Sequence, residues 1–159
     1  MNNHRPRCRH GPGVGTVLAD PALAARLLGA NASTLLRGTA VGPAVPRDGT
    51  LLGALFESLV VLSVRTYAQA NDVHEVCHLR TRDNAHEVDV VIEGGPHMRV
   101  VGLEVKLSPE VDDHDVRHLV WLRDRLGDRF ADGAVITTGP YAYRRADGIA
   151  VIPAALLGP

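Results

Sequence analysis

The sequence predicts an α/β fold in which helices pack against a mixed β-sheet. A long apolar helical pattern over residues 50–70 is followed by three strand-like segments, then by an amphipathic helix and two further short strands. The 159 residues fit one compact domain, and apolar (45%) and charged (22%) fractions are typical of soluble globular proteins. We therefore expect one core to hold most of the chain.

The N-terminal part predicts little regular structure. Residues 1–15 are rich in arginine, histidine, proline and glycine without apolar periodicity, which indicates a disordered basic tail. Residues 16–49 predict a short helix and a linker. The helix has Asp20 as N-cap, Pro21 at its first position and Gly29 just past its end, and breakers crowd residues 37–49.

Residues 50–159 are expected to form the domain itself. Thr50 can cap a helix that reaches about Ala70. Its length and few charges would suit a membrane span, but Glu57 and Arg65 interrupt the apolar run, which favours a core helix and no membrane. The first residues lack the apolar stretch of a secretory signal, so we expect a cytoplasmic location.

Three strands are predicted over residues 73–79, 87–93 and 98–106, separated by short turn-like segments. Residues 116–126 predict an amphipathic helix with Gly127 at its C-terminal end. Residues 133–138 and 149–152 predict two more strands. The first three strands are expected to form a meander.

Charged residues inside these apolar strands are the candidates for chemistry. Because side chains alternate faces along a strand, Glu104 and Lys106 share a face. On the preceding strand, Val88, Val90 and Ile92 are expected on the face opposite Asp89. Pairing of these strands through the Gly94-Gly95 turn would bring Asp89 close to Glu104. Such charges are costly to bury unless they are paired or bind a metal.

Two carboxylates and a backbone carbonyl form a set of hard oxygen ligands suited to Mg²⁺ or Mn²⁺. Lys106 beside them can stabilise charge that develops on a phosphate. The pattern is typical of phosphodiester hydrolysis. The structural alternative is an ion pair between Glu104 and Lys106, with Asp89 bonded to a turn.

These residues resemble the PD-(D/E)XK nuclease-like superfamily, through Asp89 and Glu104-Val105-Lys106. Its restriction-endonuclease-like core runs α-β-β-β-α-β. More narrowly, the chain resembles the C-terminal domain of unknown function 4143 of prokaryotic AAA+ ATPases. That resemblance is carried by five motifs in order, namely Asp20-Pro21-Ala22-Leu23-Ala24, Leu55-Phe56-Glu57, Arg80-Thr81-Arg82-Asp83, Glu87-Val88-Asp89 and Glu104-Val105-Lys106.

The resemblance implies that Asp89 and Glu104 are metal ligands, that Val105 offers its carbonyl, and that Lys106 is the catalytic lysine. Glu57 would support the site from the first core helix, although a partly exposed carboxylate paired with an arginine is the alternative. The implied function is a Mg²⁺- or Mn²⁺-dependent nuclease-like domain acting on DNA. The alternative is a catalytically silent module that serves an AAA+ ATPase in trans.

The chain itself is not expected to be an ATPase, because residues 11–16 lack the Gly-Lys-Ser/Thr ending of a phosphate-binding loop. A net charge of −1 offers no overall field for nucleic acid, so contact with DNA would need a local patch. Two arginine groups are candidates for it, namely Arg80 with Arg82 and Arg144 with Arg145. His114 and His118 lie one helical turn apart, but without a third ligand of matching spacing a solvated helix face is favoured.

Overall fold

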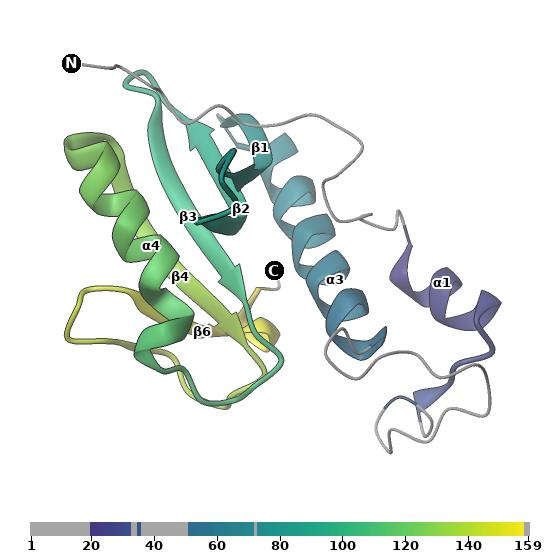
Figure 1. Ribbon diagram of the computed structural model, residues 1–159. Coiled ribbons are helices and arrows are strands. Elements are labelled where there is room, and N and C mark those ends of the chain that lie inside the picture. Colours follow the sequence, from purple (N-terminus) through teal and green to yellow (C-terminus); the bar gives the residue numbers. More distant parts are fainter. Residues whose placement is uncertain (1–19, 33–34, 36–50, 72, 158–159) are drawn as a thin grey trace.

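The computed structural model describes residues 20–32, 35, 51–71 and 73–157, and in this part of the chain six strands form one mixed sheet. Helix α3 (Leu51–Gln69) and helix α4 (Asp113–Leu126) lie on opposite faces of the sheet (Figure 1). This arrangement confirms the predicted α/β class. The predicted basic tail, residues 1–15, and most of the predicted linker, with Thr50, lie outside the described residues.

The sheet has the strand order β1-β2-β3-β4-β6-β5. The strands are β1 (Val73–Arg80), β2 (Glu87–Gly94), β3 (Arg99–Val105), β4 (Phe130–Thr137), β5 (Tyr143–Arg144) and β6 (Ala150–Pro153). The meander β1-β2-β3 is antiparallel, as predicted, whereas β3, β4 and β6 run parallel and β5 is antiparallel to β6. Parallel strands need a crossover, and α4 is the crossover between β3 and β4. The two-residue strand β5 was not predicted.

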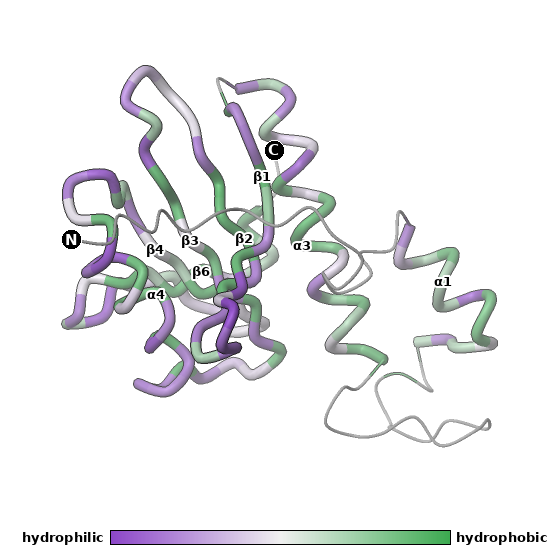
Figure 2. The backbone as a smooth tube through the Cα atoms, turned by 45° about the horizontal axis from the view of Figure 1, so that its top comes forward, coloured by the Kyte–Doolittle hydropathy of each residue, from purple (hydrophilic) through white to green (hydrophobic). Residues whose placement is uncertain are grey.

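Both helices cover apolar faces of the sheet. The core under α3 contains Val60, Val61, Val64, Val90, Leu103, Ala134, Ile136 and Ala150. The core under α4 contains Cys77, Leu79, Val88, Val91, Val100, Val116, Leu119, Leu122, Val135 and Ile149. Hydrophobic residues accordingly dominate the middle of the sheet, and hydrophilic residues gather in the surrounding loops (Figure 2).

The ends of the helices follow from local chemistry. Helix α4 begins with a capping box, in which the Asp112 carboxylate accepts from the Asp115 amide and the Asp115 carboxylate accepts from the Asp112 amide. It ends at Gly127, whose φ of 54° suits glycine. Helix α1 (Pro21–Leu27) starts at the predicted Asp20 cap and lies next to α3 (Figure 1).

A β-bulge in β2 corrects one prediction about side-chain faces. Cys77 pairs with Val91 and Leu79 pairs with Val88, so three steps along β2 match two steps along β1. Val88 therefore joins the core under α4, instead of sharing the α3 face with Val90. A bulge inserts one extra residue and changes the direction of the strand, which a simple alternation of faces cannot anticipate. Asp89 lies within this bulge.

Helix α3 is long and apolar enough to cross a membrane by length and composition, a property that core helices of soluble proteins share. One face of α3 packs against the sheet. The buried residues of the helix are Leu55, Ser58, Val60, Val61 and Val64. Leu59 and Leu62 are exposed. This packing agrees with the predicted core helix. That the helix does not span a membrane stays a prediction.

Candidate metal centre

Asp89 and Glu104 lie on the adjacent antiparallel strands β2 and β3. The last paired residues of this ladder are Val90 and Leu103, so Asp89 and Glu104 occupy the next position on each strand. Asp89 Oδ2 accepts a hydrogen bond from the backbone amide of Val105 at 2.8 Å. The Asp89 side chain thus satisfies an amide that would otherwise need a backbone carbonyl from β2. Because the N–H and C=O of one strand residue point to the same neighbour, the Val105 carbonyl also points towards β2.

Glu104 is a carboxylate buried at the end of an apolar strand, with only 3% of the residue exposed. Its Oε1 atom is buried and has no hydrogen-bond partner among the described residues. Burial raises its pKa to about 9. The charge of Asp89 and a side-chain hydrogen bond with Asp89 add to the increase, while Lys106 and Arg117 oppose it. A carboxylate in this state needs either a proton or a cation, because burial of an unpaired charge is costly.

Lys106 lies next to Glu104, as the two-residue period predicts. Its Nζ is 3.7 Å from Glu104 Oε2 and 4.0 Å from Asp115 Oδ1, and about a third of its side chain is exposed. The ion pair of the structural alternative is therefore present, but it leaves Glu104 Oε1 without a partner. Lys106 is also the only lysine in the sequence, among 17 lysine and arginine residues.

Glu57 approaches this group from α3. Burial raises its pKa, followed by the negative charge of Asp89, and the charges of His78, Glu87 and Lys106 also act on it. The structure therefore brings Glu57 into the electrostatic range of Asp89 and Lys106. We call Glu57, Asp89, Glu104, Val105 and Lys106 the carboxylate centre.

The sequence analysis missed two side chains beside the carboxylate centre, His78 and Asp115. His78 Nδ1 is 3.3 Å from the Asp89 carbonyl oxygen, and its Nε2 is 3.1 Å from Glu87 Oε1. Asp115 reaches Lys106 from the first turn of α4. Asp115 could have been found from its place in the helix that follows the Glu-x-Lys strand, whereas the position of His78 depends on the pairing of β1 with β2.

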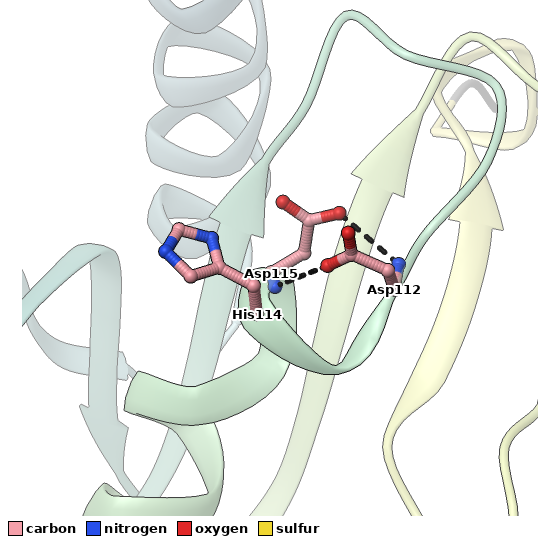
Figure 3. Close-up of side chains that lie close together, drawn as sticks. All are labelled: Asp112, His114 and Asp115. Carbon is pink, nitrogen blue, oxygen red and sulfur yellow. Dashed lines mark hydrogen bonds between the residues drawn. The ribbon is translucent and has the colours of Figure 1, made fainter.

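A second group of possible metal ligands lies at the start of α4, where ligand atoms of Asp112, His114 and Asp115 are within 4.8 Å of one another (Figure 3). Both carboxylates already accept backbone amide hydrogen bonds in the capping box. Asp112 and His114 are also exposed. The capping role accounts for this cluster.

Arginines of both predicted patches form ion pairs within the protein, and the patches differ in where those pairs lie. Arg144 forms two hydrogen bonds of 2.9 Å with the carboxylate of Asp132, and Arg145 binds Asp113 and Asp147. Both are thus engaged within the protein. Arg80 is paired as well, 3.5 Å from Oε2 of Glu87, which lies two residues before Asp89 on β2. Of the two patches, the one around Arg80 is therefore the better placed to meet a phosphate at the centre.

The family model of a domain of unknown function, DUF4143, matches residues 52–157. The chain belongs to the DUF4143 family. The DUF4143 match runs from the start of α3 to the end of the described chain, so it includes every residue of the carboxylate centre. No curated protein matches the chain. What the DUF4143 domain does therefore has to be argued from its geometry.

Proposed function

We propose that this DUF4143 domain is a metal-dependent nuclease-like domain of the PD-(D/E)XK type that hydrolyses DNA phosphodiesters. The observation that carries the proposal is the buried Oε1 of Glu104, which accepts no hydrogen bond from the part of the chain that the structure describes, although Asp89 and Lys106 lie beside Glu104. An oxygen in this position suits a cation.

The ligand set fits Mg²⁺ or Mn²⁺. Asp89 and Glu104 would offer carboxylate oxygens and Val105 its carbonyl, and hard divalent cations prefer such oxygen ligands. Two carboxylates close together also repel each other, and a divalent cation would offset that repulsion. When bound, the ion would neutralise phosphate charge and acidify a nucleophilic water.

The remaining side chains have separate roles in the proposal. The ammonium group of Lys106, fixed by Glu104 and Asp115, would stabilise negative charge on the scissile phosphate. Glu57, whose pKa is raised by burial and by the charge of Asp89, would hold or release a proton beside Asp89. Arg80 and Arg117 add positive charge near the centre, which is the local patch that DNA contact requires.

The test is cleavage of single-stranded, duplex and branched DNA by the purified chain with Mg²⁺, Mn²⁺ or EDTA. We expect cleavage with either ion and none in EDTA, and loss of cleavage in Asp89→Ala and Glu104→Ala. Glu110→Ala removes an exposed carboxylate outside the centre and is the matched control. The nuclease proposal fails if no substrate is cut with either ion, or if both variants cut like the wild type. The alternative function, a catalytically silent module that serves an AAA+ ATPase in trans, would then be favoured.

A further inference from the structure

Two histidines from distant parts of the chain meet beside α4. His86 precedes β2 and His118 lies in the middle of α4, and their Nδ1 atoms are 3.4 Å apart. The ring centroids are 5.5 Å apart with the ring planes nearly perpendicular, at 88°. The two Nδ1 atoms share a hydrogen bond, in which one ring donates and the other accepts according to its tautomer, so both nitrogens point into one shared space.

The position of His86 is fixed by its surroundings. Its backbone amide donates to Thr81 Oγ1 at 3.0 Å and its carbonyl accepts from the Thr81 amide at 2.9 Å, which closes the turn between β1 and β2. Its ring stacks on Trp121, with centroids 4.0 Å apart and 8° between the planes. This arrangement limits the rotation of the imidazole, so its nitrogen is held in place before any ligand arrives.

We infer that His86 and His118 bind a divalent transition-metal ion, with His114 as a third ligand. Zinc–nitrogen bonds are about 2.0–2.1 Å long, so two nitrogens on a tetrahedral ion lie about 3.3 Å apart. The observed 3.4 Å matches that separation. His114 lies four residues before His118 on the same helix face and is exposed. Its ligand atom lies within 4.8 Å of those of Asp112 and Asp115, so a side-chain rotation would be needed for it to reach the pair.

The chemistry of this site differs from that of the carboxylate centre. Imidazole nitrogens favour Zn²⁺, Ni²⁺ and Cu²⁺, whereas carboxylate and carbonyl oxygens favour Mg²⁺ and Mn²⁺. The histidine site can be followed separately through Trp121, which stacks on His86, and the inference does not depend on nuclease activity.

Trp121 provides the test, because it is the only tryptophan in the chain and stacks on His86. We expect Ni²⁺ to quench its fluorescence with saturation at one ion per chain, and Zn²⁺ to compete. Since each variant loses a ligand, affinity should fall by about tenfold or more in His118→Gln and His86→Gln. His118→Gln leaves the His86–Trp121 stack in place, and circular dichroism checks that both variants fold.

A control variant defines the outcome. His97→Gln, which removes an exposed histidine in the turn between β2 and β3, should bind Ni²⁺ like the wild type. Quenching that does not saturate, or equal affinity in folded His118→Gln, would overturn the inference. Unchanged affinity in His114→Gln would overturn the assignment of the third ligand.

Discussion

The carboxylate of Asp89 accepts a hydrogen bond of 2.8 Å from the backbone amide of Val105. This contact joins the bulge of β2 to the last residue of β3, where the two strands cease to pair. It therefore fixes the end of the β2–β3 ladder, and it holds the Asp89 carboxylate next to Glu104.

Replacement of Asp89 separates its structural role from its charge. Asp89→Ala should leave the Val105 amide unsatisfied and lower the free energy of unfolding by about 1–3 kcal/mol. Asp89→Asn retains an oxygen acceptor, so it should lose less stability but still lose stabilisation by Mg²⁺. Urea denaturation with and without Mg²⁺ measures both effects. Equal stabilisation by Mg²⁺ in the wild type and Asp89→Asn would contradict a ligand role for this carboxylate.

Glu104 should make stability depend on pH when no metal is present. Its folded pKa of about 9 lies above its ordinary value of 4.5, so the folded protein keeps a proton that the unfolded chain releases. The contribution of Glu104 to the free energy of unfolding is then fully present below pH 4.5 and is lost as the pH rises towards about 9. In EDTA, Glu104→Gln should become increasingly more stable than the wild type across this range, as measured by thermal unfolding. A constant difference between the two proteins would refute the shift.

Lys106→Arg tests whether the side chain is more than a positive charge. A guanidinium can keep an ion pair with Glu104, but it is larger and planar and presents its hydrogen bonds in a fixed fork. We expect the variant to fold with near wild-type stability and to lose DNA cleavage by about tenfold or more, a loss typical of a transition-state contact. Circular dichroism and cleavage assays measure the two effects. A fully active Lys106→Arg variant would reduce Lys106 to a structural ion pair.

The start of α4 should respond to capping chemistry. Asparagine is as good an N-cap as aspartate, whereas alanine is poor, so Asp112→Asn should keep the thermal unfolding midpoint and Asp112→Ala should lower it. A metal site at Asp112, His114 and Asp115 would instead make both variants lose stabilisation by a divalent ion. Thermal unfolding with and without Zn²⁺ distinguishes the two cases.

Gly102 is required by the close packing of α4 on β3. A Cβ at this position would lie 2.9 Å from Leu119 Cδ2 and 3.1 Å from Leu122 Cδ2, and both leucines are fully buried. Gly102→Ala should therefore lower the free energy of unfolding by about 1–3 kcal/mol. In a Leu119→Val background the same change should be less damaging, because the shorter side chain gives room. Additive effects in this double-mutant cycle, measured by urea denaturation, would contradict the packing explanation.

The sequence by itself determined the features that depend on local geometry. The period of 3.6 residues and the caps at Asp20 and Gly127 located helices, and the period of two placed Glu104 and Lys106 on one face. These patterns act within a few residues, so they need no knowledge of the rest of the chain. They were sufficient for the α/β class and for the order of the main elements.

Only the tertiary structure decided which distant side chains meet. The bulge at Asp89, the approach of Glu57 from α3 and the contact of His86 with His118 all depend on strand register and helix packing. The same is true of Glu104, whose burial and unpartnered oxygen arise only when α4 and the neighbouring strands close over it. A one-residue change of strand register would move strand residues such as Asp89 and Glu104 to the opposite face, and neither composition nor periodicity specifies that register.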